Sequence, residues 1–288
     1  MFAGTYTAIV TPFDEDQSVD FDAFEALIER QIAAGVDGIV PVGTTGESPT
    51  VDFDEHQEII RRVVAAAAGR CQVIAGTGAN STKEALMLTE HARLAGADAT
   101  LQVTPYYNKP SQEGLFRHFS AIADLGLPVV LYNIPGRTSR EIEVDTIVRL
   151  AAHTGIVAVK EATGSVDTAS KIIARTDLDV LSGDDSLTLA LMAVGAKGVI
   201  SVASNVLPGP MTTFTHDVLA GNWDAARDFH CRHFRLFNDL FIDTNPIPVK
   251  AALAMMGLIK EVYRLPMCEM SQDKKDRLAA TLSETGII

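Results

Sequence analysis

The sequence has few of the features that mark exported or membrane-spanning proteins. Its 288 residues hold three cysteines, Cys71, Cys231 and Cys268, which are far apart and form no C-x-x-C pair. This spacing is typical of reduced thiols in a cytosol, and we expect all three to have packing roles. No basic leader precedes the acidic residues at 14–16, so we expect no signal peptide. No run of about 18 apolar residues is present to span a bilayer.

Positive charge is scarce as well. Lysine and arginine number 24 against 37 aspartates and glutamates, a net charge of -13. Such a chain repels nucleic acid and anionic membrane surfaces, so we expect neither as a partner, and we predict a cytoplasmic protein. A local cluster of hydrogen-bond donors can still bind an anion, so the acidity does not exclude small anionic substrates.

What the sequence does contain is a repeated unit. Apolar runs that end in polar, Gly or Pro residues recur roughly every 20 to 32 residues, and a helical pattern follows each run. The eight runs are Tyr6–Pro12, Gly38–Thr44, Cys71–Gly76, Ala99–Pro105, Pro128–Asn133, Ile156–Lys160, Asp179–Gly183 and Gly198–Ala203.

The segments between these runs predict amphipathic helices. The first has Phe24 and Ile28 on one face, and Ser81 with Glu84 has the spacing of a capping box at the start of the third. Eight strand-then-helix units predict an α/β fold, a (β/α)8 TIM barrel with parallel, buried strands. A doubly wound sheet is the competitor, but it does not usually need eight such units, and no G-x-G-x-x-G follows the first strand.

From Leu207 onward the pattern is helical only, with helices predicted at 224–241, 249–256 and 271–283. We therefore predict that residues 1–206 form the barrel strands and most barrel helices. Residues 207–288 would form the last barrel helix and a C-terminal helical extension.

The sixth run ends in an unusual residue for a buried strand, Lys160. Burial disfavours the charged form of an amine, so such a lysine is suited to act as a nucleophile that forms a Schiff base with a ketone. For a lone V-K-E pattern the commoner outcome is a lysine that extends to solvent or pairs with a carboxylate such as Glu161. The residues at the ends of the other strands favour the interpretation of Lys160 as a nucleophile.

Active-site residues of a TIM barrel follow the carboxyl ends of the strands. Thr44 and Thr45 lie between two glycines that allow a tight, anion-binding turn, although G-T-T-G taken alone favours an ordinary turn. Tyr132 and Tyr107 offer phenols for proton transfer, and Arg137 offers a fork for a carboxylate. The tyrosines could instead pack at the rim of the barrel, and Arg137 could instead form an ion pair at the surface. Two further strand ends supply Gly183 and Ile200.

Four motifs in this order resemble one family. They are G-T-T-G-E at 43–47, T-P-Y-Y-N at 104–108, Y-N-I-P-G-R-T at 132–138 and K-E-A-T-G at 160–164. Together with N-P-I-P-V-K at 245–250, they are similar to the dihydrodipicolinate synthase branch of the pyruvate-dependent class I aldolases. The likeness covers nearly the whole chain, and the arginine of the third motif is the part most specific to this branch.

The resemblance implies a reaction and a role for each matched residue. Lys160 would form the Schiff base with pyruvate, and Tyr132 would donate and accept protons. Thr44 would link Tyr132 to Tyr107, which would come from a neighbouring subunit. Thr45 would bind the pyruvate carboxylate. The remaining matched residues, Arg137, Gly183 and Ile200, would bind substrate, with Arg137 holding the carboxylate of L-aspartate 4-semialdehyde.

The product would be 4-hydroxy-tetrahydrodipicolinate, formed in the first committed step toward diaminopimelate and lysine. The lysine imine serves as the electron sink, so no cofactor and no metal is expected. The resemblance also implies a homotetramer built as a dimer of dimers.

A second site, for L-lysine as an inhibitor, is also implied. The matching residues are Ser48, His56, Asn80, Glu84 and Tyr106. Two residues depart from the pattern of lysine-sensitive members, namely Pro49 and Phe53.

Three other functions are alternatives. A metal-dependent hydrolase would need ligands at strand ends, yet all seven histidines fall in predicted helices or loops, and the adjacent Asp184 and Asp185 are weak evidence for a cation. N-acetylneuraminate lyase and other keto-sugar-acid aldolases or dehydratases share Lys160, and Arg137 is the residue that argues against them. A catalytically silent barrel has no use for the full set of site residues.

Overall fold

The computed structural model describes residues 2–288, and eight parallel strands form its centre. Each strand pairs with the next along the chain, and β1 pairs with both β2 and β8, which closes the barrel. The strands are β1 Gly4–Ala8, β2 Gly38–Val40, β3 Gln72–Gly76, β4 Ala99–Val103, β5 Val129–Asn133, β6 Ile156–Glu161, β7 Asp179–Ser182 and β8 Gly198–Ser201. The predicted (β/α)8 barrel is confirmed.

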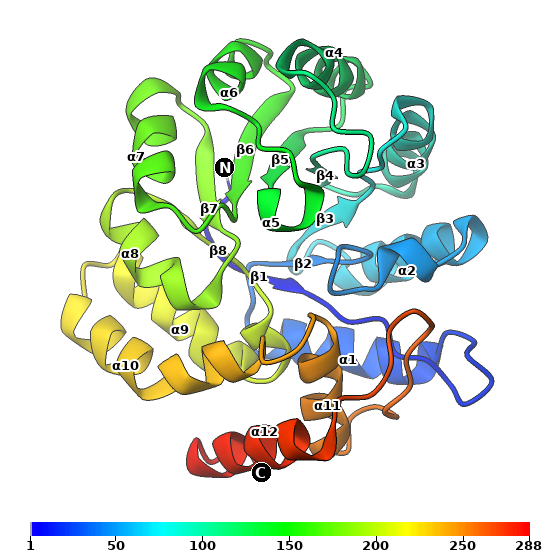
Figure 1. Ribbon diagram of the computed structural model, residues 1–288, viewed down its shortest axis with the longest axis vertical. Helices are drawn as coiled ribbons and strands as arrows, with labels where there is room; N and C mark the ends of the chain where they lie inside the picture. The colour runs from blue at the N-terminus through cyan, green and yellow to red at the C-terminus, as the bar shows by residue number, and fades with distance from the viewer. Residues whose placement is uncertain (1) are drawn as a thin grey trace.

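Helices surround the ring of strands (Figure 1). They are α1 Phe21–Ala33, α2 Phe53–Ala67, α3 Thr82–Ala95, α4 Gln112–Ala123, α5 Pro135–Thr138, α6 Val144–Ala151, α7 Val166–Arg175, α8 Thr188–Ala193, α9 Pro208–Leu219, α10 Trp223–Asp239, α11 Ile247–Met255 and α12 Gln272–Glu284. Three short 3-10 helices lie at Ser48–Thr50, Asp185–Leu187 and Ala203–Asn205. No helix in this part of the chain combines the length and apolar character needed to span a bilayer.

Two apolar clusters stabilise the barrel, because each strand alternates its side chains between the inside and the outside. Inside the ring, one cluster contains Tyr6, Leu101, Tyr132 and Ile200. Outside it, a larger cluster fills the space between strands and helices and includes Phe24, Ile28 and Phe119. A parallel strand covered on both faces must be apolar throughout, which explains why all eight runs are visible in the sequence.

The C-terminal extension lies against the barrel. In Figure 1, α11 and α12 lie on the side of the barrel opposite α4 and α6, and α12 packs against α10 and α11. Helix α11 is buried along most of its length, from Ile247 to Leu253. A buried lysine, Lys250, belongs to this helix.

The structure corrects two local expectations. Ser81 precedes α3, but its exposed side chain makes no capping hydrogen bond. The capping box lies instead at α2, where Asp52 accepts from the Glu55 amide and Glu55 accepts from the Asp52 amide. An aspartate carboxylate caps at least as well as a serine hydroxyl.

The packing roles expected for the cysteines hold only in part. Cys71 is half-buried, whereas Cys231 and Cys268 are exposed, and all three are free thiols. Cys231 lies on α10, and Cys268 lies in the connection between α11 and α12. Hydrophobic packing therefore does not explain these two positions.

Candidate active site

The loop after β2 has an unusual backbone. Val42 and Glu47 flank the G-T-T-G turn, and both have left-handed backbone angles, with φ of 52° and 54°. A β-branched residue such as Val42 is rarely found there, and such strain persists only where the surroundings enforce it. This conformation also explains why β2 ends at Val40 rather than at the predicted Thr44.

Gly76 of β3 supports one end of this loop. Its amide donates to the carbonyl of Pro41 at 2.9 Å. A Cβ atom at this glycine would lie 2.4 Å from the carbonyl oxygen of Val42. Only glycine permits this close approach, which holds the first strained residue in place.

A buried ion pair supports the other end. Nζ of Lys250 lies 2.5 Å from Oε1 of Glu47, and their side chains are 0% and 2% exposed. The ammonium also lies 4.2 Å from the ring centroid of Phe13. Burial lowers the pKa of Lys250, and the Glu47 carboxylate opposes that shift. Helix α11 is thereby fixed to a loop 203 residues earlier in the chain.

Asn245 lies just before α11 and contacts two predicted site residues. Its Nδ2 donates to Oγ1 of Thr45 at 3.0 Å, and its backbone carbonyl accepts from Nη2 of Arg137 at 2.9 Å. The sequence showed Asn245 only as part of a motif in the helical tail and gave it no role. That motif was the one available signal.

Lys160 lies inside the barrel and is only 6% exposed. It is in register with Tyr132 on the neighbouring strand, and its Nζ lies 4.1 Å from the centroid of the Tyr132 ring. The lysine therefore does not extend to solvent. Gly183 leaves room beside it, because a Cβ there would lie 3.2 Å from Cε of Lys160 and 2.6 Å from Cβ of Ala162.

Glu161 does not pair with Lys160. Successive strand residues point to opposite faces, so Glu161 lies on the outer side of β6. It is buried and accepts from the Thr163 amide at 2.8 Å, and burial raises its pKa to about 7. Lys160 affects a different acid, Asp184. Burial raises the pKa of Asp184, and the positive charge on Lys160 opposes that shift.

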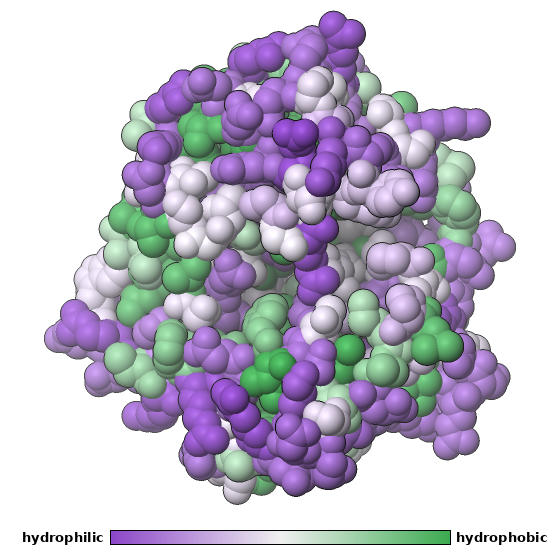
Figure 2. Space-filling view, in the orientation of Figure 1, coloured by the Kyte–Doolittle hydropathy of each residue, from purple (hydrophilic) through white to green (hydrophobic). Residues whose placement is uncertain are grey.

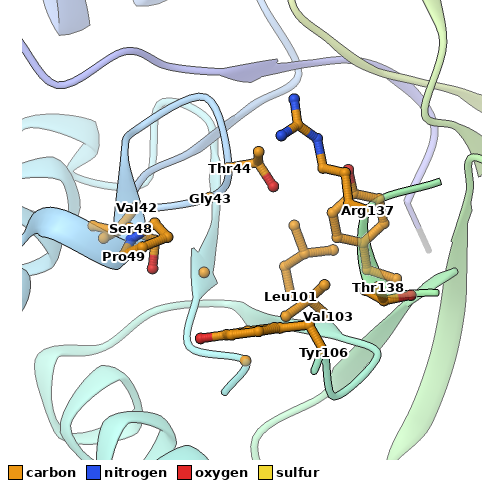
Figure 3. Close-up of a pocket in the computed structure, with 13 residues that line it drawn as sticks. Val42, Gly43, Thr44, Ser48, Pro49, Leu101, Val103, Tyr106, Arg137 and Thr138 are labelled. Carbon is orange, nitrogen blue, oxygen red and sulfur yellow. The ribbon is translucent and has the colours of Figure 1, made fainter. Parts of the chain in front are cut away.

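A cavity of about 210 Å³ opens at the carboxyl ends of the strands. Thr44, Tyr132 and Arg137 line it, and the face shown in Figure 2 is hollowed near its centre. In Figure 3, Thr44 and Arg137 lie at one end of the cavity and Tyr106 at the other. The predicted residues Thr45, Lys160, Gly183 and Ile200 do not line this cavity, but Lys160 contacts the Tyr132 ring that does.

The predicted proton relay is not assembled within one chain. Tyr107 is 91% exposed and has a left-handed backbone, with φ of 72°. Within residues 2–288, no hydrogen bond joins its hydroxyl to Thr44 or Tyr132. Thr44 and Tyr132 do share the cavity.

The residues implied for lysine binding lie partly in the same cavity. Ser48 and Tyr106 line it, and the charge on Glu84 adds to the burial that raises the pKa of Tyr106. His56 is buried in α2, where its Nε2 lies 2.8 Å from the Gly76 carbonyl oxygen, and burial lowers its pKa. The carbonyl of Asn80 accepts a hydrogen bond from a neighbouring loop.

Asp184 and Asp185, the adjacent acids that offered weak evidence for a cation, follow β7. Among residues 2–288, no group of three or more His, Cys, Asp or Glu side chains is placed to hold a metal ion. Asp185 is fully engaged, because it accepts from Ser201 Oγ at 2.6 Å and from the amides of Val202 and Ala203. These bonds give Asp185 a structural role at the end of β7.

The chain as a whole is similar to known proteins. The model of the Dihydrodipicolinate synthetase family matches residues 1–285. The chain belongs to this family. It is therefore a lyase of the class I aldolase type, which acts through a lysine imine and uses no cofactor.

Several relatives are similar along their whole length. A 4-hydroxy-tetrahydrodipicolinate synthase from Thermodesulfovibrio yellowstonii is 52% identical, with both chains fully covered. A chloride-inhibited dihydrodipicolinate synthase from Acinetobacter baumannii complexed with pyruvate is 44% identical, with full coverage of both chains and a TM-score of 0.98. The enzyme from Cyanidioschyzon merolae with lysine bound is 41% identical, covers 100% of this chain and 99% of its own, and has a TM-score of 0.97.

Proposed function

We propose that this protein condenses pyruvate with L-aspartate 4-semialdehyde to give 4-hydroxy-tetrahydrodipicolinate, with Lys160 as the nucleophile. The observation that carries the proposal is the place of Lys160, buried inside the barrel with its Nζ 4.1 Å from the Tyr132 ring centroid. An aromatic ring can stabilise a nearby cation, including the iminium formed on this nitrogen.

The chemistry proceeds in four steps. The amine of Lys160 attacks the keto carbon of pyruvate, and water leaves to form the iminium. Loss of a methyl proton gives an enamine, whose carbon attacks the aldehyde of the second substrate. The amino group of that substrate then attacks the imine carbon, which closes the ring and releases Lys160. Tyr132 transfers the protons in this scheme.

Two sets of donors fit the two carboxylates. Thr45 lies in the strained loop and binds the carboxylate of pyruvate. Arg137 lines the cavity and binds the carboxylate of the aldehyde, which suits a planar guanidinium. A keto-sugar-acid aldolase is the second candidate, since it would use the same lysine. Arg137 favours the first, because a polyhydroxylated chain offers no second carboxylate.

We also propose that L-lysine binds near Ser48, Glu84 and Tyr106 and inhibits the enzyme. Ser48 and Tyr106 line the cavity that contains Thr44, so an effector there would lie close to the substrate site. We also propose that the protein forms a homotetramer. In such an assembly the exposed Tyr107 of one subunit would enter the active site of a neighbouring subunit. A cytoplasmic location and the division of the chain at residues 206 and 207 stay predictions.

The test is consumption of pyruvate by the purified protein with L-aspartate 4-semialdehyde. Borohydride should trap pyruvate on Lys160, and mass spectrometry can locate the adduct. Lys160→Ala should abolish consumption, whereas Lys171→Ala, which changes an exposed lysine paired with Asp167, should leave it unchanged. Arg137→Ala should raise the KM for the aldehyde.

The outcomes separate the two candidates. Trapping of pyruvate without consumption in the presence of L-aspartate 4-semialdehyde would support a sugar-acid aldolase. Absence of trapping would exclude both. Titration with L-lysine to millimolar concentration without loss of rate would exclude the proposed effector.

A further inference from the structure

Asn245 is a buried polar residue that joins the two predicted carboxylate-binding side chains. It is only 5% exposed and lies 200 residues from Thr45 along the chain. Its side chain holds Thr45 and its backbone holds Arg137, at 3.0 Å and 2.9 Å. Buried polar groups normally have partners, and the Oδ1 atom of Asn245 has none among the described residues.

The direction of the side-chain bond matters for Thr45. A hydroxyl has one hydrogen to donate and two lone pairs that accept. Because the amide of Asn245 donates to Oγ1 of Thr45, one lone pair of the hydroxyl is occupied and its own hydrogen stays free. That hydrogen is then available to a substrate carboxylate, which can only accept.

The backbone bond has a separate effect on Arg137. A guanidinium has five N–H donors in a fixed planar arrangement. The carbonyl of Asn245 uses one of them, at Nη2, and so sets the plane of the fork. The remaining donors stay available for a second carboxylate.

The same segment is locked to the loop that carries Thr45. Lys250 follows Asn245 by five residues and pairs with Glu47, which follows Thr45 by two. The two segments are thus joined by a buried ion pair and by the Asn245–Thr45 hydrogen bond. Such a double link restricts the distance between Nδ2 and Oγ1.

We propose that Asn245 is a positioning residue that directs the hydroxyl hydrogen of Thr45 toward the pyruvate carboxylate and fixes the orientation of Arg137. This inference rests on the proposed function, since it assigns no chemistry of its own to Asn245. It predicts that the side chain of Asn245 affects the binding of pyruvate through Thr45, and that its backbone carbonyl affects the binding of the second substrate through Arg137.

Two substitutions test this division. Asn245→Ala removes the donor to Thr45 and keeps the backbone carbonyl, so we expect the KM for pyruvate to rise about tenfold. The KM for the aldehyde should change much less. Asn245→Asp replaces the donor with a carboxylate, which accepts the hydrogen of Thr45 and repels the substrate carboxylate. Its KM for pyruvate should exceed that of Asn245→Ala by about another factor of ten.

A merely structural role predicts the opposite order. Aspartate has the shape of asparagine, so it would then resemble the unchanged protein more closely than alanine does. Asn238→Asp, the same change at an exposed position on α10, is the matched control and should leave both KM values unchanged. If Asn245→Ala does not fold, Asn245→Ser supplies the comparison with Asn245→Asp.

Trapping with borohydride separates this inference from the proposed function. If the unchanged protein forms no pyruvate adduct on Lys160, both fail. If the adduct forms, a KM for pyruvate that is unchanged in Asn245→Ala, or lower in Asn245→Asp than in Asn245→Ala, overturns the inference alone. The expected order, with adduct still formed at saturating pyruvate, supports it.

Discussion

Replacing Lys250 with methionine should destabilise the protein strongly. Methionine has a similar length but no charge, so Lys250→Met leaves the carboxylate of Glu47, 2% exposed in its side chain, without its ion-pair partner. Removal of one partner from a buried pair typically costs about 3–5 kcal/mol. The backbone amide of Arg264, 3.4 Å from Oε2 of Glu47, is a weak replacement. We therefore expect the free energy of unfolding to fall by about 4 kcal/mol.

The assay is urea unfolding followed by far-ultraviolet circular dichroism, at one protein concentration because assembly affects apparent stability. The double variant Glu47→Gln/Lys250→Met is the control, because it removes both charges. It should recover more than half of the loss, since the cost arises from an unpaired charge rather than from lost packing. A loss below about 1 kcal/mol in the single variant, or no recovery in the double variant, would refute the reasoning.

Three further outcomes can be measured. Gly183→Ala should lower kcat/KM about a hundredfold, because the new Cβ lies 2.6 Å from Cβ of Ala162 and 3.2 Å from Cε of Lys160 and so displaces the segment that carries the lysine; an unchanged rate would contradict this. The pKa of Glu161 is about 7 in the folded protein, against an ordinary value of 4.5. The folded state therefore keeps a proton that the unfolded chain releases, and stability falls as pH rises from 4.5 to 7, by up to about 3 kcal/mol. Glu161→Gln should raise Tm relative to the unchanged protein at pH 8 but not at pH 4.5. Asp52→Ala should cost about 1 kcal/mol of unfolding free energy through loss of the α2 cap, whereas Ser81→Ala should change it by less than about 0.5 kcal/mol.

The strands could be predicted from the sequence because burial on both faces makes each one apolar throughout. Their ends were less visible. The run beginning at Gly38 continues to Thr44 in the sequence, but Pro41 and the left-handed backbone of Val42 end β2 at Val40. Hydrophobicity does not report such a conformation, because Gly76, on another strand, enforces it.

The residues at strand ends could also be named in advance, because parallel strands place their carboxyl ends together. Asn245 could not be given a role, since its contacts with Thr45 and Arg137 depend on where the chain returns after the barrel. The pairing of Glu47 with Lys250 cannot be predicted from the sequence for the same reason. Asp52 and Glu55 have the same capping-box spacing as Ser81 and Glu84, so spacing alone does not distinguish the real cap from the false one.

The return of the chain at Asn245 and Lys250 also affects how the site forms during synthesis. A nascent chain that has emerged through β8 already contains Lys160 and Tyr132. It still lacks the amide that holds Thr45 and the ammonium that neutralises Glu47. The nucleophile is thus made well before the residues that hold the loop of Thr45. Translation must pass residue 250 before that loop gains its full support.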